Sequence, residues 1–157
     1  MLLLRWIFTS LSAIVSTAGL AGEAFYSNEE VTAKVLNQTV TLEVARTVEE
    51  LRHGLMYRKS LADHHGMLFV LQTPRPIALW MKNTLIDLDA AFLDEDGCIF
   101  QVVGMERETL ALHRSIGPAA YAVEMRRGWF EKNHVTKGDC FKPLPKPQPE
   151  RVSLLNR

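Results

Sequence analysis

The sequence LDAAFLDEDGCIFQVV, at residues 88–103, decides the fold class of this chain. Two apolar runs of strand length, 88–93 and 98–103, are separated by the acidic turn 94–97. Gly97 ends that turn, where a tight connection needs a positive φ that glycine adopts without strain. The stretch therefore predicts a β-hairpin.

Strand patterns continue on both sides of this hairpin. Residues 31–36 and 39–45 are rich in β-branched side chains and are joined by Asn37, at which we expect the positive φ of a second hairpin turn. Residues 67–71 form a continuous apolar run, typical of a strand buried on both faces, and we expect the prolines that follow to end it. Residues 119–125 alternate, with Glu124 among alanines, and 140–142 form a last short strand. The pattern predicts one mainly β domain.

Short helices are predicted at two places. Thr47 and Glu50 form a capping box, so a helix should run over 48–53 and end at Gly54. Residues 128–134 suggest one or two further helical turns. The fold class is therefore mainly β with one or two short helices.

The stretch PIALWMKNTLIDLD, at residues 76–89, mixes polar groups into an apolar run. If 77–82 is a strand, Leu79 and Met81 share the core face while Trp80 and Lys82 share the other. Asn83 then begins a bend. Polar groups so close to the core need partners or water, so this stretch is either a hydrogen-bonded support or the floor of a site.

The ends of the chain have a different character from its middle. Residues 1–21 carry Arg5, an apolar run too short for a comfortable membrane span, and small residues at Gly19 and Ala21, which is the pattern of a signal peptide cleaved after Ala21. The alternative is an uncleaved membrane anchor. We expect a leader over 22–30, a single β domain over 31–142, and a Pro-rich flexible tail over 143–157.

Composition limits the classes of partner. The chain has 18 basic and 18 acidic residues, and removal of the signal peptide takes away Arg5 alone, which leaves a net charge near −1. A protein that replaces phosphate counterions needs a basic surface. We therefore expect a protein that binds no nucleic acid. From the signal-peptide pattern we expect it to be exported, periplasmic or secreted, and to contact a membrane only if the signal segment stays uncleaved.

The two cysteines, Cys98 and Cys140, are a candidate disulfide because exported proteins mature in an oxidising compartment. Each also precedes a bulky apolar residue in an expected strand, so unpaired cysteines fit the sequence as well. No neighbouring base or helix start is present to lower either thiol pKa, which disfavours a catalytic thiolate.

The chain resembles the domain of unknown function 192 family of small, often exported bacterial and archaeal proteins. The likeness runs from about Val40 to Phe141 and rests on residues 43–47 with Glu50, 54–56 with Arg58, 66–69, 80–84, 88–89 with Phe92, 94–97, Glu124, Gly128 and 138–139. The resemblance implies a compact β sandwich or barrel with a jelly-roll-like layout and no established activity. Asp87 stands where the family commonly has proline, and neither cysteine matches a family landmark.

Our leading hypothesis is a binding or accessory module for a small polar ligand or an envelope protein, with no cofactor. The candidate ligand-binding residues are Arg46, Trp80, Lys82, Asn83, Thr84, Asp89 and Glu124. Trp80 would be a stacking platform and Arg46 would pair with a carboxylate. Alternatively Arg46, Lys82, Asp87, Asp89 and Glu124 form a buried ion-pair network that fixes strand register.

Two other functions are open from the residue types. Asp89 and Glu124 could be the acid and base of a glycosidase-like hydrolase, which needs them at a defined separation across the substrate. Thioethers and imidazoles suit copper, but methionine is also common core filler and no ligand motif is present, so we assign no metal site. The residues concerned are Met56, Met67, Met81, Met105 and Met125 with His53, His64, His65, His113 and His134. No catalytic triad order, zinc spacing or phosphate loop occurs.

Overall fold

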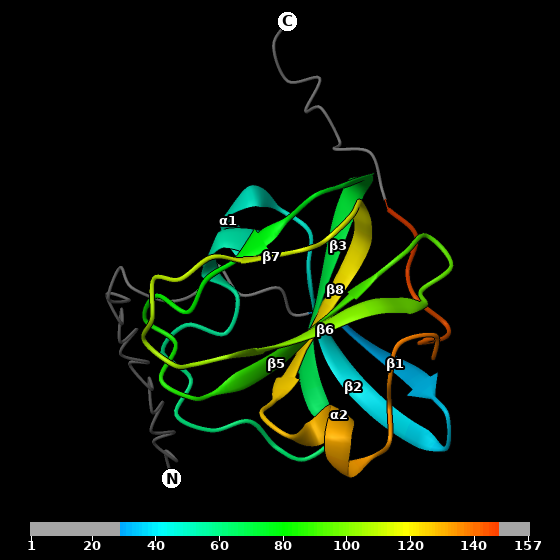
Figure 1. Ribbon diagram of the computed structural model, residues 1–157, viewed down its shortest axis with the longest axis horizontal. Helices are drawn as coiled ribbons and strands as arrows, with labels where there is room; N and C mark the ends of the chain where they lie inside the picture. The colour runs from blue at the N-terminus through cyan, green and yellow to red at the C-terminus, as the bar shows by residue number, and fades with distance from the viewer. Residues whose placement is uncertain (1–28, 148–157) are drawn as a thin grey trace, which may run out of the picture.

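The computed structural model describes residues 29–147 (Figure 1). The predicted signal peptide, most of the leader and the end of the Pro-rich tail lie outside these residues. The elements within them are β1 (Glu30–Val35), β2 (Gln38–Ala45), α1 (Val48–His53), β3 (His65–Arg75), β4 (Ala78–Leu79), β5 (Leu88–Leu93), β6 (Ile99–Met105), β7 (His113–Arg114), β8 (Ala119–Arg126) and α2 (Trp129–Lys132). The prediction of a mainly β chain with one or two short helices is confirmed.

Six strands form one mixed sheet in the order β1-β2-β3-β8-β5-β6, and β4 pairs with β7 in a separate two-stranded sheet. All neighbouring strands are antiparallel except β2 and β3, whose parallel pairing requires a crossover that contains α1. The two predicted hairpins are β1-β2 and β5-β6. The central strands β3 and β8 are therefore flanked on both sides.

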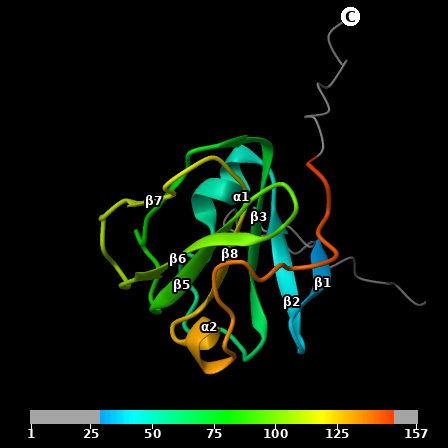
Figure 2. The same ribbon diagram turned by 45° about the vertical axis from the view of Figure 1, so that its right-hand side comes forward.

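The large sheet carries a hydrophobic core on each face. Alternation along β8 places Tyr121, Val123 and Met125 in one core cluster and Ala122 in the other. α2 and Phe141 pack with the first cluster, whereas the second lies under α1 and the β4-β7 pair. Figures 1 and 2 show α1 and β7 at one end of the molecule and α2 at the other.

The sheet is not a closed barrel, because its outer strands β1 and β6 do not pair with each other. Residues 138–142 bridge the two edges instead. On one side the Ile99 amide donates to the Asp139 carbonyl and the Ile99 carbonyl accepts from the Gly138 amide, at 2.9 and 2.8 Å. On the other side Lys34 and Lys142 bond each other through their backbones at 2.7 and 2.9 Å. The predicted last strand over 140–142 is thus a pair of isolated bridges.

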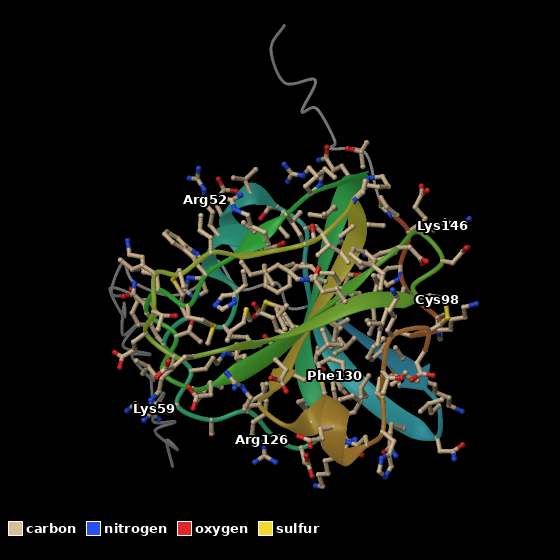
Figure 3. All side chains as sticks on the ribbon, viewed as in Figure 1. Arg52, Lys59, Cys98, Arg126, Phe130 and Lys146 are labelled. Atoms are coloured by element: carbon tan, nitrogen blue, oxygen red, sulfur yellow. A yellow bond between two sulfur atoms is a disulfide. The ribbon has the colours of Figure 1, made fainter. Side chains whose placement is uncertain are left out.

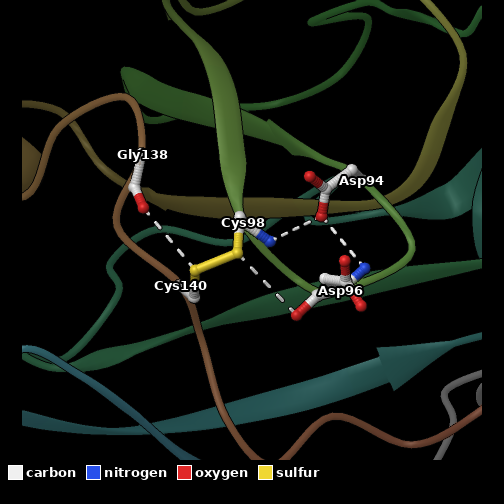
Figure 4. The surroundings of a disulfide bond; sticks show 5 residues. All are labelled: Asp94, Asp96, Cys98, Gly138 and Cys140. Carbon is white, nitrogen blue, oxygen red and sulfur yellow. Dashed lines mark hydrogen bonds between the residues drawn. A yellow bond between two sulfur atoms is a disulfide. The ribbon is translucent and has the colours of Figure 1, made fainter.

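Cys98 and Cys140 form a disulfide where this segment meets β6 (Figure 4). The Cys98 amide donates to Asp94 Oδ1 at 2.9 Å, so the acidic turn of the β5-β6 hairpin supports the bridge. Of the two states that the sequence allowed, the structure contains the disulfide.

Three local expectations were wrong. The positive φ of the β1-β2 turn is taken by Leu36, at 51°, and not by Asn37. β3 does not end before its prolines but continues through Pro74 to Arg75, after a register shift that lets the strand end lie alongside Ala119. The strand expected over 77–82 is reduced to Ala78–Leu79 and leaves the main sheet. Residues 77–82 therefore lie over the main sheet, not in it.

Residues 29–147 contain no helix with the length and apolar character required to cross a bilayer.

Candidate functional site

A pocket lies between α1, the β4-β7 pair and the sheet face below them. Its volume is about 210 Å³. The residues that line it are Leu51, Arg52, His53, Gly54, Leu55, Met56, Phe69, Ala78, Leu79, Trp80, Thr84, Leu112 and Glu124. Three of the seven candidate residues from the sequence, Trp80, Thr84 and Glu124, come together here.

Glu124 is the ionisable group at the sheet side of the pocket. It lies on the central strand β8, opposite Met67 of β3 and Ala90 of β5, and only 4% of its surface is exposed. Its carboxyl makes no hydrogen bond or ion pair with any residue of the described chain, and burial raises the pKa of Glu124 to about 8. The side chain is therefore a neutral carboxylic acid at pH 7, with a donor and an acceptor available.

α1 ends directly beside this carboxyl because Gly54 turns the chain with a φ of 50°. The capping box of Thr47 and Glu50 is present at the other end of the helix, as predicted. A Cβ at Gly54 would stand 3.3 Å from Phe69 Cζ and 3.9 Å from Glu124 Oε2. Glycine thus serves two purposes, since it permits the turn and leaves room in front of the carboxyl.

Trp80 forms the outer wall of the pocket. The predicted alternation is confirmed, with Leu79 and Met81 buried, Trp80 40% exposed and Lys82 exposed. The Lys82 ammonium lies 5.4 Å from the centroid of the Trp80 ring, in cation–π contact. The indole is thus partly exposed to solvent and partly in contact with the pocket.

Asn83 and Thr84 hold this wall in place. Asn83 adopts a φ of 56°, its side-chain amide donates to the Tyr57 hydroxyl at 2.8 Å, and its carbonyl accepts from the Tyr57 amide at 2.8 Å. Thr84 is buried, and its backbone bonds Met81 and Glu108. The bend is therefore as expected, and Asn83 braces the pocket rather than lining it.

The predicted cluster of Arg46, Lys82, Asp87, Asp89 and Glu124 is not formed. Arg46 instead binds Glu29 through two hydrogen bonds of 2.8 and 3.1 Å. Asp87 accepts from the Arg107 amide at 2.8 Å. Neither the charged site nor the buried network anticipated from these five residues exists in the described chain.

Asp89 lies on the opposite face of the sheet from Glu124. It stands opposite Met125 on β8, the position next to Glu124, and adjacent positions on a strand point to opposite faces. Its carboxylate accepts from the Gly128 amide at 2.7 Å and pairs with Arg127 at 3.1 Å, which anchors the start of α2. Burial raises the pKa of Asp89, and the bonds to Gly128 and Arg127 oppose that effect.

This geometry contradicts the hydrolase hypothesis. An acid and a base must flank one bond of the substrate, whereas a full sheet separates these two carboxyls. The copper hypothesis gains no geometric support either. Met67, Met81, Met105 and Met125 are core residues, and no group of three or more His, Cys, Asp or Glu side chains within 29–147 is arranged around a metal position.

Sequence reasoning missed the contribution of α1 and β3 to the pocket. Residues 51–56 and Phe69 appeared as helix, cap and core. The signal available was Gly54, whose place directly after a predicted helix indicates a close approach of backbone to another element. Which element approaches Gly54 depends on strand pairing across the sheet, so it cannot be predicted from the residues next to Gly54.

The family model DUF192, described as "Uncharacterized ACR", matches residues 30–142. No curated protein matches. A crystal structure from Sinorhizobium meliloti 1021, described as a "putative transcription regulator", is 31% identical, with a TM-score of 0.73 over 77% of this chain and 97% of that one. A protein of unknown function from Novosphingobium aromaticivorans DSM 12444 is 27% identical, with a TM-score of 0.68 over 73% of this chain and 85% of that one. The match of the family model to most of the domain shows that the chain belongs to the DUF192 family.

Proposed function

We propose that the protein is an exported binding module that holds a small ligand in the pocket between Glu124 and Trp80. The observation that carries the proposal is the Glu124 carboxyl, which is buried, has no hydrogen-bond or ion-pair partner within residues 29–147 and borders a pocket. Burial of a polar group without a hydrogen bond costs on the order of 1–3 kcal/mol. A ligand that supplies the missing bond removes this cost.

The rest of the pocket supports a small ligand with an apolar part. Most of the side chains that line it are apolar, among them Leu55, Phe69 and Leu79, and the exposed Trp80 extends this surface to the solvent. Binding sites typically combine such walls with a few well-placed polar groups. A pocket of about 210 Å³ has room for a small ligand, since a cavity of about 150 Å³ already holds benzene.

Export is the second part of the proposal. It is supported by the signal-peptide pattern of residues 1–21 and by the Cys98–Cys140 disulfide, since disulfides persist in oxidising compartments. The mass of the mature protein tests it. Loss of residues 1–21 is expected, and a mass that still includes them would refute cleavage after Ala21.

The binding function is tested by thermal unfolding of the protein with a panel of small amines, amino acids, sugars, carboxylates and metal ions. We expect at least one class to raise the Tm, because a ligand that binds only the native state stabilises it. Trp80→Ala should abolish that shift. Leu110→Ala is the matched control, since Leu110 is 68% exposed and does not line the pocket. A panel without any shift, or a shift that Trp80→Ala retains, would refute the proposal.

A further inference from the structure

We propose that the ligand of this pocket is a small organic ammonium ion whose charge pairs with the Glu124 carboxylate. The inference rests on the proposed function, because it assigns a chemical class to the ligand of the same site. It follows from the kinds of atoms that the pocket presents.

The residues that line the pocket include groups that attract a cation. Besides the Glu124 carboxyl they are the aromatic residues Phe69 and Trp80. Aromatic faces attract ammonium groups through their quadrupole, and a carboxylate in a site of low dielectric does so more strongly. The Trp80 ring already takes an ammonium, since Lys82 Nζ stands 5.4 Å from its centroid.

The cationic residues of this region lie at its rim. Arg52 is exposed, and in Figure 3 its side chain lies on the outer side of α1. Lys82 is exposed as well, and solvent and salt screen charges at such positions. Besides Glu124 and Arg52, the titratable residue that lines the pocket is His53, the last residue of α1. The neighbours of Glu124 on β3 and β5 are Met67 and Ala90, which carry no charge.

The shape of the site limits the size of the cationic group. The space between Glu124 and Phe69 is bounded by Gly54, where one additional carbon would already make contact with both side chains. A primary or singly methylated ammonium on a short alkyl chain fits this description, with its chain along Leu79 and Trp80. A large head group does not.

Pairing with an ammonium requires Glu124 to lose its proton. The pKa of Glu124 is about 8 in the free protein, so about one carboxyl in eleven is ionised at pH 7. An alkylammonium, with a pKa near the lysine value of about 10.4, stays charged through pH 9. Apparent affinity follows the ionised fraction, so it should fall roughly tenfold from pH 9 to pH 7 and tenfold again to pH 6.

The test is isothermal titration calorimetry of the full-length protein with three probes of one shape: n-butylammonium, n-butanol and butyrate. We expect butylammonium to bind most tightly, with the pH dependence above and release of about 0.9 proton per site at pH 7, measured in buffers of different ionisation enthalpy. Equal or tighter binding of butanol or butyrate would overturn the ammonium assignment and leave the pocket as a binding site. Absence of binding by all three would overturn the ammonium assignment, whereas the binding function itself is overturned only by a ligand panel without any Tm shift.

Two variants complete the design. Glu124→Gln should weaken butylammonium binding at pH 9 by about tenfold or more and remove proton release, because the amide cannot ionise. Asp89→Asn changes a buried carboxylate on the other face and should leave affinity and proton release unchanged. Thermal unfolding of each variant checks that it is folded. Undiminished binding by folded Glu124→Gln would overturn the assignment.

Discussion

The burial of Glu124 makes a quantitative prediction about stability. Its carboxyl has a pKa of about 8 in the folded chain against 4.5 for the free group, so between these values the native state holds a proton that the unfolded state has lost. The contribution of Glu124 is fully present below pH 4.5 and is lost as the pH rises through 8. The free energy of unfolding should therefore fall by about 1.4 kcal/mol per pH unit over this interval, on account of this one group.

The size of the effect can be read from one substitution. Glutamine has the shape of the neutral acid and does not ionise, so Glu124→Gln should remove the slope. From pH 5 to pH 7 the difference in free energy of unfolding between parent and variant should change by about 2.5 kcal/mol in favour of the variant. Other titrating groups cancel in this difference because both proteins contain them.

Urea denaturation at pH 5, 6, 7 and 8 measures this difference directly. Glu106→Gln is the matched control, since Glu106 is exposed and does not line the pocket. The profile of the control should run parallel to that of the parent. If the Glu124→Gln profile also ran parallel, Glu124 would be ionised or solvated in the folded protein, and the reasoning about its burial would be refuted.

Three further predictions concern the supports of the site. Gly54→Ala should lower the free energy of unfolding by about 1–3 kcal/mol, because alanine is strained at a φ of 50° and its Cβ stands 3.3 Å from Phe69; an unchanged urea midpoint would contradict this account of the turn. Replacement of Cys98 and Cys140 by serine opens a loop of 42 residues and should cost about 4 kcal/mol by loop entropy, seen as a lower urea midpoint than that of the oxidised parent. Asp89→Asn should cost about 1–3 kcal/mol through its weakened ion pair and hydrogen bond, and an equal loss of ligand affinity would count against the separation of the two faces.

Much of the fold was readable from local patterns. The hairpin over 88–103 and the capping box of Thr47 each depend on residues a few positions apart, and the structure contains both. Alternation along β8 correctly separated Glu124 from Tyr121, Val123 and Met125. These features could be predicted because the period of a strand and the cap of a helix are properties of the local backbone.

The arrangement of the site was not readable in the same way. Asp89 and Glu124 belong to adjacent strands that are far apart in sequence, and the register between those strands decides that the two carboxyls face opposite sides. The sequence places Arg46 among the candidate site residues, but its partner Glu29 lies in the segment 22–30 that the sequence predicts to be a leader. Pairing between residues this far apart depends on the whole sheet, so it cannot be predicted from any short segment of the sequence.

The mixed stretch over 76–89 shows the same limit. Its apolar residues read as a strand, and Leu79 and Met81 are indeed buried. The strand pairs with β7, however, and crosses the sheet face that holds Glu124. A pocket arises because this layer and α1 meet over one buried carboxyl.

The central claim is that Glu124 is neutral in the free protein and ionises when the ligand binds. The most direct measurement is carbon-13 NMR of the glutamate side-chain carboxyl carbons as a function of pH, with the Glu124 signal assigned by its loss in Glu124→Gln. We expect this signal to titrate near pH 8 in the free protein, and to show an ionised carboxylate at pH 7 when n-butylammonium is saturating. A Glu124 signal that titrates near 4.5 and does not respond to the amine would contradict the account.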